Sequence, residues 1–411
     1  MTVTWDWPER GVVFWPVGNG DAVTVVVDDE TFIQFDINHR DEADGDDDPR
    51  VPAVDRLAEL LPISEDGNPV LSVLAISHHD EDHCSGFPKM LEQEFEIGEM
   101  WITLRSFVEH KADSGGLTDA AEAVYGEACR RRKAEIEAHA RGRRAAVGSR
   151  LRVIGNADVL NDPDWRDFPT DLLTSAGQYV PVIVGNADKV DVVEVFVHTP
   201  FRSDTHDGSR NSSSLGVQLT LKGGDCQKKF LLLGDLEYQQ IEAFVEKSMD
   251  RRNDERLHWD VLLAPHHGSR NAIRRRDGDE WVDAIAAEHL KRYAEDGAIV
   301  VVSSRSLKEV QGDDSDPPHK DAQEGYARIV GDEENVLFTS DYAEGSASDP
   351  LTVEVGDGVC GQVNSPPSGG GEGVGKAVLV GAAALGVAAA LAAGRARRGD
   401  RQTGPRSKPF A

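Results

Sequence analysis

Residues 77–86 read Ser-His-His-Asp-Glu-Asp-His-Cys-Ser-Gly, and they follow an apolar run at 70–76 that predicts a buried strand. Four side chains within this stretch can bind a metal ion: His78, Asp80, Asp82 and His83. A loop that leaves a strand can bring such side chains to one point. Two imidazoles and two carboxylates suit a divalent ion such as Zn²⁺ or Mn²⁺. The alternative interpretation is a polar surface loop.

Two later segments also end in groups that can bind metal. Residues 230–235, Phe-Leu-Leu-Leu-Gly-Asp, predict an apolar strand that ends at Asp235. Residues 260–269, Asp-Val-Leu-Leu-Ala-Pro-His-His-Gly-Ser, predict another strand, which is followed by His266 and His267. Three strands with such groups at their ends would bring them together at one edge of a sheet. The sequence therefore favours a metal site over a surface loop.

The order of these segments resembles the metallo-β-lactamase superfamily. The usual His-x-His-x-Asp-His pattern of that superfamily is present as His78-x-Asp80-x-Asp82-His83. The aspartate in second place, together with the late His-His-Gly-Ser, resembles the hydrolase domain of the competence protein ComEC and its stand-alone relatives. Further similar stretches, in the same order, are Val17-Gly18-Asn19-Gly20-Asp21-Ala22, the strand 32–36 that ends at Asp36, Asn211-Ser212-Ser213-Ser214-Leu215, and Asp316-Pro317-Pro318-His319.

This resemblance implies a four-layer αβ/βα sandwich, an α/β fold, over residues 1–360. Short apolar runs between residues 192 and 303 suit its inner strands. A less family-like segment at about 107–188 is expected to be a helical insertion. Asp21 is interpreted mainly as a turn residue, because it lies in the turn-forming Gly-Asn-Gly-Asp sequence.

The resemblance also implies two divalent metal ions, Zn²⁺ or Mn²⁺, with a hydroxide held between them as the nucleophile. The implied ligands are His78 and Asp80 for one ion, Asp82, His83 and His266 for the other, and Asp235 as the bridge between them. The first of these sites lacks a third protein ligand. Its candidates are Asn211, His198 and His206.

Of the two adjacent histidines, His266 is assigned as the ligand because it follows its strand directly. His267 would lie one residue further out, where it would act as a general acid, hold a phosphate, or only hydrogen-bond to a ligand. Asp82 is expected at the catalytic centre as well as on the metal.

Several arginines follow the predicted strand that precedes His266 and His267, and they suggest a phosphoester substrate. Arg270 and Arg274 suit bidentate contacts with phosphate, although they would equally fit an exposed basic loop. His319, in the late family-like loop, is expected to close over the site. These three residues are the predicted substrate-binding groups.

Three functions are compatible with these residues. The leading one is a dinuclear metal phosphodiesterase that acts on nucleic acid or on a nucleotide. The second is a metal-dependent hydrolase of a carboxylic ester or lactone. The third is a membrane-tethered binding module with a degenerate site, against which the nearly complete ligand set argues. The sequence identifies no protein partner.

The composition restricts these functions. The formal net charge of −29 repels polyanions at long range and argues against nonspecific DNA binding. The four cysteines have no paired spacing, so we expect neither a disulfide framework nor a Cys₄ zinc site. Two basic clusters on a predicted helix at 118–144 would contact phosphate or pair with nearby acids, and the pairing is favoured.

The two ends of the chain carry the remaining expectations. Residues 1–10 have no apolar segment, so no signal peptide is predicted and a cytoplasmic catalytic domain is expected. Residues 361–375 are expected to be a Pro/Gly/Ser linker, 376–394 a possible transmembrane helix, and 395–411 a basic tail. The alternative for 376–394 is an Ala-rich helix or a disordered tail in water. The positive-inside rule would instead place the tail in the cytoplasm and the enzyme outside.

Overall fold

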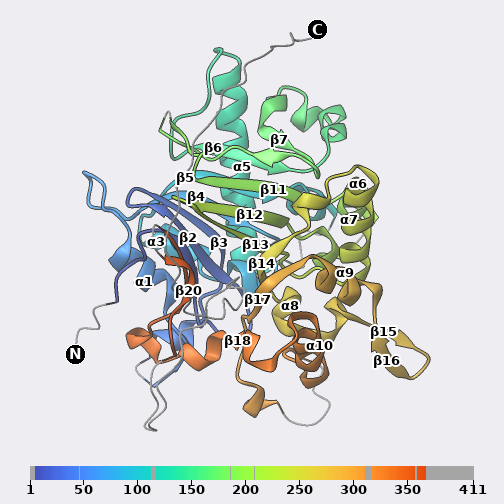
Figure 1. The fold of residues 1–411 in the computed structure, drawn as a ribbon. Helices are drawn as coiled ribbons and strands as arrows, with labels where there is room; N and C mark the ends of the chain where they lie inside the picture. The colour runs from blue at the N-terminus through green and yellow to red at the C-terminus, as the bar shows by residue number, and fades with distance from the viewer. Residues whose placement is uncertain are drawn as a thin grey trace, which may run out of the picture.

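Two mixed β-sheets lie face to face, and helices cover the outer face of each sheet (Figure 1). In the view of Figure 1, α1 and α3 lie at the left, α7, α9 and α10 at the right, and the sheets between them. This is the predicted four-layer αβ/βα arrangement. The computed structural model describes residues 5–45, 47–112, 117–185, 187–207, 209–310, 316–356 and 359–366.

One sheet comes mainly from the first half of the chain and has nine strands in the described ranges. In spatial order they are β20 (Val359–Val363), β19 (Leu351–Gly356), β1 (Gly11–Phe14), β2 (Ala22–Asp28), β3 (Thr31–Ile37), β4 (Val70–Ile76), β5 (Glu96–Thr103), β6 (Arg150–Ile154) and β7 (Leu173–Thr174). The last strands of the chain complete this sheet, because β19 pairs with β1.

The second sheet has seven strands among the described residues. In spatial order they are β18 (Val336–Phe338), β17 (Ala294–Val302), β14 (Trp259–Leu263), β13 (Cys226–Leu232), β12 (Gly216–Gly223), β11 (Val193–Thr199) and β8 (Tyr179–Val180). Two short hairpins stand apart from both sheets. They are formed by β9 (Ile183–Val184) with β10 (Ala187–Asp188), and by β15 (Arg274–Asp277) with β16 (Glu280–Asp283).

The helices pack on the outer faces through their apolar stripes. Their bounds are α1 (Ala53–Leu60), α2 (Glu81–Cys84), α3 (Phe87–Glu92), α4 (Arg105–Ala112), α5 (Asp119–His139), α6 (Arg202–Asp207), α7 (Tyr238–Asp250), α8 (Pro265–Gly268), α9 (Ile285–Tyr293) and α10 (Lys320–Val330). In α7, Ile241, Phe244 and Val245 are buried, which is the spacing of one helix face.

The apolar strands are explained by burial on both faces. In β1, Val12 and Phe14 lie between the two sheets, whereas Val13 lies under the helices. In β13, Phe230 likewise lies between the two sheets, whereas Leu231 lies under the helices. Successive side chains of a strand point to opposite faces, so an inner strand of four layers must be apolar at nearly every position.

Parallel pairing places the functional loops at a common edge of each sheet. The strands β3, β4, β5, β6 and β7 are parallel neighbours, and so are β13, β14, β17 and β18. Their carboxyl ends therefore lie together within each sheet, and this is where the motif loops begin. The backbone N–H of Leu215 donates to the carbonyl of Ser77, which joins the two edges.

The segment predicted as a helical insertion, 107–188, is part of the sandwich. It contains α5, and it also supplies β6 and β7 to one sheet and β8 to the other. These strands are only two to five residues long, so their pattern in the sequence is weak. Thr118 is the N-cap of α5, as predicted, and its side chain accepts a hydrogen bond from the Ala121 backbone.

Two arginines of the basic cluster on α5 are paired internally. Arg130 and Arg131 both bind Glu127, and Arg131 also donates to the carbonyls of Ile97 and Arg150. The predicted pairing with nearby acids is thereby confirmed for this pair of arginines.

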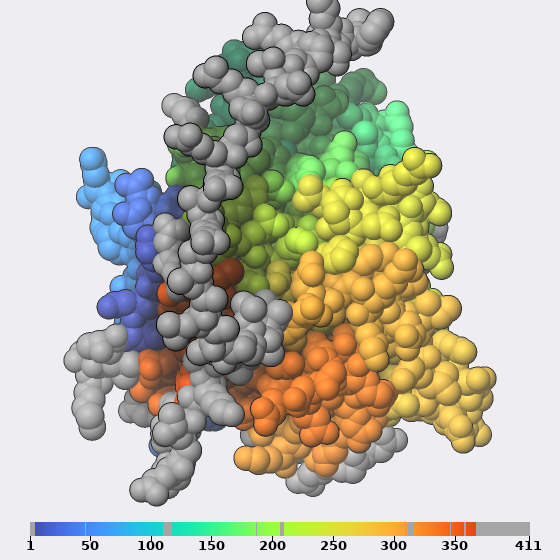
Figure 2. All heavy atoms as spheres, in the orientation of Figure 1, coloured from blue at the N-terminus to red at the C-terminus, as the bar shows by residue number. Residues whose placement is uncertain are grey.

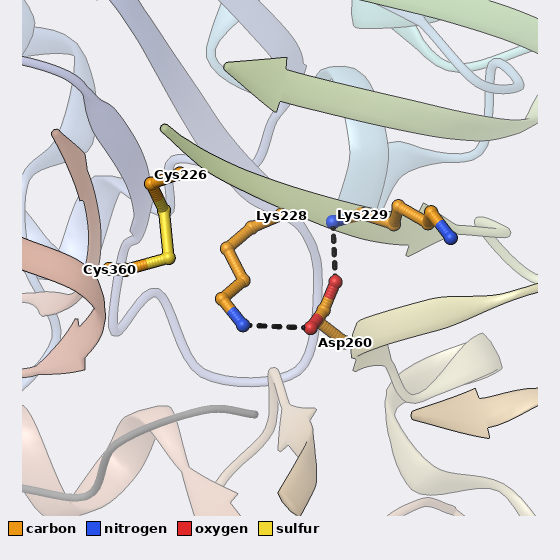
Figure 3. The surroundings of a disulfide bond; sticks show 5 residues. All are labelled: Cys226, Lys228, Lys229, Asp260 and Cys360. Carbon is orange, nitrogen blue, oxygen red and sulfur yellow. Dashed lines mark hydrogen bonds and ion pairs between the residues drawn. A yellow bond between two sulfur atoms is a disulfide. The ribbon is translucent and has the colours of Figure 1, made fainter. Parts of the chain in front are cut away.

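A disulfide joins Cys226 of β13 to Cys360 of β20, and so connects the two sheets (Figure 3). The expectation from cysteine spacing was wrong here, because 134 residues separate partners that only the sandwich brings together. Beside it, Lys228 and the backbone of Lys229 both donate to the buried carboxylate of Asp260 (Figure 3).

Of the C-terminal segments predicted from the sequence, only the start of the linker lies within the described residues. Residues 361–363 belong to β20, so the sheet continues into the start of the segment predicted as a linker. Within the ranges given above, no helix is long and apolar enough to cross a membrane. The possible transmembrane helix at 376–394 and the basic tail lie outside the described residues.

The disulfide should stabilise the sandwich by limiting the conformations of the unfolded chain. Replacing both Cys226 and Cys360 by serine should lower the free energy of unfolding by about 2–5 kcal/mol. Denaturant unfolding with and without dithiothreitol measures this. Reductant should destabilise the wild type and leave the double variant unchanged; equal stability of the two proteins under oxidising conditions would contradict the role of the bond.

Candidate metal centre

The loop after β4 distributes its polar side chains to two sides. The carboxylate of Asp36, at the end of β3, accepts hydrogen bonds of 2.6 Å from both the backbone and the hydroxyl of Ser77. This fixes the point at which the loop leaves the sheet. His78 then lies toward Asp235, whereas His79 contacts Ser106 and Glu109. The side chains of the two adjacent histidines therefore point in different directions, and of the two only His78 lies near Asp235.

One group of four side chains meets around Asp82. Its members are Asp82, His83, Asp235 and His267, and one ligand atom from each lies within 4.8 Å of the others. The Nε2 atom of His83 is 3.0 Å from Oδ1 of Asp235. The Nε2 atom of His267 is 3.2 Å from Oδ2 of Asp82 and 3.5 Å from Oδ1 of Asp235. We name these four residues the Asp82 group.

A second set of side chains lies on the other side of the same carboxylate. The Nε2 atoms of His78 and His266 are 3.7 Å and 3.6 Å from Oδ2 of Asp235. The Nε2 atom of His78 is also 3.6 Å from Oδ2 of Asp80. We name His78, Asp80 and His266 the His78 group. Asp235 thus presents one oxygen to each group, which is the arrangement of a bridging ligand.

The two adjacent histidines lie in different groups from those expected: His267 takes the place predicted for His266, and His266 joins the His78 group. His266 faces the His78 group, and His267 faces Asp82 and His83. The reason is backbone conformation: His266, His267 and Gly268 all have positive φ, at 51°, 53° and 79°. This left-handed turn brings the second histidine into the interior, where it is 1% exposed. Strand periodicity could not predict such a reversal.

The exchange also changes the role expected for His267. Its Nδ1 atom is 3.4 Å from Asp21, and its Nε2 atom faces Asp82 and Asp235. Both nitrogens therefore lie among carboxylates, and neither points outward as a general acid or a phosphate-binding group would. His266 supplies the third group that the His78 side lacked.

The structure locates two of the three candidates for the ligand that the His78 side was expected to lack. Asn211 lies against the site, because its amide nitrogen is 3.5 Å from Nδ1 of His266. His198 does not reach the cluster: it packs on Phe196 and Phe244, and its Nε2 is 3.0 Å from the carbonyl of Arg256. Burial lowers the pKa of His198 to about 4, as expected for a neutral core histidine. The side chain of His206 lies outside the described part of the chain.

The predicted phosphate-binding arginines are engaged with an acid. Arg270 lies 3.4 Å from Asp321, and Arg274 also forms an ion pair with that carboxylate. Arg274 lies in the β15–β16 hairpin, which extends from the lower right of the molecule (Figures 1 and 2). His319 contacts the backbone of Arg270 through Nδ1 and is 6% exposed. The two arginines therefore share one carboxylate, and His319 supports the segment after α8.

The outer nitrogens of the clustered histidines have fixed partners. Nδ1 of His83 is 2.9 Å from Asp36, and Nδ1 of His78 is 3.0 Å from the hydroxyl of Ser77. Such contacts orient a metal-binding imidazole and favour the tautomer whose Nε2 is free to bind. Oδ1 of Asp21 lies 3.4 Å from Nδ1 of His267, which is an approach of two charged groups without a hydrogen bond. Asp21 keeps its place in the turn, but its buried carboxylate also lies beside His267, a neighbour that the interpretation as mainly a turn residue did not include.

The inner atoms of the cluster are buried without hydrogen-bond partners. Among the described residues, these atoms include Nε2 of His78, His83 and His267, and Oδ1 of Asp235. Each buried polar atom left unsatisfied costs about 1–3 kcal/mol, so four together are unfavourable unless protons on the imidazoles or metal cations lie among them. All four atoms are of a type that can coordinate Zn²⁺ or Mn²⁺. The residues present therefore fit a pair of divalent ions.

The electrostatics agree with that fit. Burial raises the pKa of Asp235, but His83, His267 and the other two histidines together lower it well below its usual range. Burial lowers the pKa of His267, but the carboxylates of Asp235 and Asp21 raise it to about 10. The negative potential that attracts protons to these imidazoles would equally attract a divalent cation.

Two residues near the cluster were missed in the sequence. Arg210 donates to Oδ1 of Asp80 at 3.0 Å and to Glu109 through its Nε atom. Burial raises the pKa of Glu109, but His79 and Arg210 lower it to about 2, so it stays ionised. Glu109 has no motif around it, and Arg210 merely precedes the Asn211 stretch. Only their position in space identifies them.

A third group of possible metal ligands, His39, Asp44 and Asp55, is filled by a side chain. The ammonium of Lys89 lies 2.6 Å from Asp44 and 2.8 Å from Asp55. This cation already balances the two acids, so the group offers no metal site.

Removing one histidine from the Asp82 group tests the assignment. His267→Ala should lose about one ion per chain, because it removes a buried ligand from the Asp82 group. Elemental analysis of the metal-loaded full-length chain measures this, with the exposed His139→Ala as the matched control. An unchanged metal content in His267→Ala, together with a loss in His198→Ala, would show that the ions bind elsewhere.

Metal uptake should release protons. Without an ion, His83 and His267 have raised pKa values, so both imidazoles are protonated at pH 7 and an ion must displace those protons. The apparent affinity for Zn²⁺ should therefore increase between pH 6 and pH 8, by about tenfold per pH unit for each displaced proton. Calorimetry in two buffers of different ionisation enthalpy measures the release. Uptake without any proton release would contradict the described geometry.

No family profile and no curated protein sequence matches the chain. Among solved structures it is similar to a zinc-bound PqqB from Methylobacterium extorquens, with 10% identity over 84% of this chain and 100% of that one, at a TM-score of 0.35. A B3 metallo-β-lactamase with an active-site glutamic acid has 12% identity over 70% and 88% of the two chains, at 0.32. The metallo-β-lactamase GOB-18 from Elizabethkingia meningoseptica has 12% identity over 81% and 93%, at 0.29.

Proposed function

We propose that the protein is a dinuclear metal-dependent hydrolase that cleaves phosphodiesters, in a nucleic acid or a nucleotide. The observation that carries this proposal is Asp235, whose two carboxylate oxygens face two separate groups of metal-binding side chains. The ordered motifs that resemble ComEC-like hydrolase domains support the same proposal. In this assignment His78, Asp80 and His266 hold one ion, Asp82, His83 and His267 hold the other, and Asp235 contacts both.

Two bound divalent ions would supply a water of lowered pKa as nucleophile and would stabilise negative charge on the reacting oxygens. The residues of the chain determine how such ions are held. Asp36 and Ser77 fix the rings of His83 and His78, and Asp21 lies beside His267. We propose Zn²⁺ or Mn²⁺ as the ions, and the three ligand carboxylates favour the harder Mn²⁺ more than an all-histidine site would.

Charge favours an anionic substrate at this site. The ligand carboxylates are those of Asp80, Asp82 and Asp235, and three negative charges leave a pair of divalent ions with one net positive charge. Arg210 adds a cation beside Asp80, and one-third of its side chain is exposed. Arg210 also pairs with the ionised Glu109, so a phosphoryl oxygen would share this arginine with two carboxylates. A phosphodiester, which carries one negative charge, is thus the best-matched class of ester.

A carboxylic ester or lactone is the second candidate substrate. The observation in its favour is that Arg270 and Arg274 both pair with Asp321, which makes them less available for the phosphate-binding role expected for them. A neutral ester would need no such cations. The same two groups of ligands would serve that reaction, so substrate assays must separate the two possibilities.

Asp235→Asn should reduce turnover at least a hundredfold, which corresponds to about 3 kcal/mol of transition-state stabilisation. The amide keeps the shape of the side chain, but it carries no charge and bridges two cations poorly. The assay compares bis-p-nitrophenyl phosphate, single-stranded DNA and lactones with metal-loaded full-length protein.

The exposed Asp66→Asn is the matched control for this substitution and should retain full activity. Near-wild-type turnover by Asp235→Asn with both metals bound would refute the bridging assignment. Hydrolysis of lactones alone would replace the phosphodiesterase proposal by the second candidate.

A further inference from the structure

The two carboxylate oxygens of Asp80 have different neighbours. Oδ2 lies 3.6 Å from Nε2 of His78, inside the His78 group. Oδ1 accepts a hydrogen bond of 3.0 Å from the guanidinium of Arg210. One oxygen of this ligand is thus directed at the clustered histidines, and the other is bound to a cation. That cation can compete with a metal ion for the same carboxylate.

An arginine without other partners would bind Asp80 more completely. The guanidinium is a planar fork of N–H groups that matches the two oxygens of a carboxylate, so a two-point contact is its preferred arrangement. In that arrangement Arg210 would occupy Oδ2 as well as Oδ1. The hydrogen bond from Arg210 to Asp80 instead reaches Oδ1. Another group must therefore hold the guanidinium in its observed position.

Glu109 is that group. The Nε atom of Arg210 donates to Oε1 of Glu109, whereas a terminal nitrogen of the same guanidinium donates to Asp80. The guanidinium is planar and rigid, so turning it toward both oxygens of Asp80 would break the bond from Nε. The two acids thus divide one cation, and the share that Glu109 takes is not available to Asp80.

Glu109 is itself fixed from two sides. On its own helix, α4, the Nε atom of Arg105 donates to Oε2 of Glu109 at 3.2 Å, and Arg105 also donates to the carbonyl of Thr205. From the ligand loop, Nε2 of His79 lies 3.2 Å from the same Oε2 atom, and Nδ1 of His79 lies 3.2 Å from the hydroxyl of Ser106. The Glu109 side chain is 12% exposed. Its position is therefore set by groups other than the metal ligands.

We propose that Glu109 is a positioning residue of the His78 group, because it holds Arg210 away from Oδ2 of Asp80 and leaves that oxygen for the metal ion. Asp80 then contacts its ion through one oxygen and Arg210 through the other. Glu109 touches neither ion and acts only through Arg210. This inference rests on the two-ion assignment made under the proposed function.

Two single-site backgrounds test the proposal. His267→Ala keeps the His78 group intact, and His266→Ala keeps the Asp82 group intact. Titration of the metal-free full-length proteins with Zn²⁺, in the presence of a competing chelator, measures the affinity for the remaining ion. In the His267→Ala background, Glu109→Ala should lower that affinity by about 10- to 100-fold, as is usual for residues that orient metal ligands. In the His266→Ala background, Glu109→Ala should leave the affinity unchanged.

Removing Arg210 distinguishes positioning from a merely structural role. In the His267→Ala background, adding Arg210→Ala to Glu109→Ala should restore the affinity, because the competing cation is gone. Arg210→Ala without the change at Glu109 should not lower the affinity. The matched control is Glu246→Ala, which removes an exposed glutamate of α7 and should have no effect in either background.

Several outcomes would overturn the inference. They are an equal loss of affinity in both backgrounds, no recovery when Arg210→Ala is added, and a loss caused by Arg210→Ala alone. The last variant leaves Glu109 in place, so it decides the question even if Glu109→Ala does not fold. A wild type that binds no metal would refute the two-ion assignment itself. Two bound ions whose affinities do not respond to Glu109→Ala would refute only the positioning role.

Discussion

The carboxylate of Asp235 is the constraint on which the functional edge of the molecule depends. It is 3% exposed and surrounded by the imidazoles of His78, His83, His266 and His267. A charge buried this deeply is stable only if opposite charges compensate for its lost hydration. Protonated histidines can do this in the absence of metal, and divalent ions can do it better. The loops of both sheets must therefore converge on this one residue.

The sandwich makes that convergence possible. Parallel strands deliver Asp36 and His78 from one sheet and Asp235 and His267 from the other, all at their carboxyl ends. The disulfide from Cys226 to Cys360 links the same two sheets through β13 and β20. A stable relation between the sheets keeps donor atoms from opposite sheets within bonding distance of a shared ion.

Around the ligands, acids and hydroxyls hold the imidazole rings, while arginines stand at the periphery. Asp36 and Asp21 contact the outer nitrogens of His83 and His267, which directs the inner nitrogens toward the centre. Arg210 and Arg40 contact Asp80 and Glu81 on the outside of the ligand loop. Negative charge is thus concentrated around the clustered histidines, and the two arginines pair with acids on the outer side of the loop.

Much of this site could be read from the sequence alone, because its ligands follow apolar strands in short, dense motifs. His78, Asp80, Asp82, His83 and Asp235 were predicted in that way, as were most inner strands, whereas the four layers were implied by the resemblance to the metallo-β-lactamase superfamily. Local pattern determines which residue types are present and that a strand precedes them. It carries no information about contacts between residues far apart in the chain.

Only the tertiary structure decided the remaining features, each of which depends on a long-range or left-handed arrangement. Because His266 and His267 both have positive φ, the side chain of His267 lies in the Asp82 group. Asp21, in its turn, lies beside His267, and His198 changed from a possible ligand to a core side chain. The sequence by itself determined the chemistry of the donors, because that resides in the side chains. The fold decided which donors meet, because distance in space is set by packing and not by order along the chain.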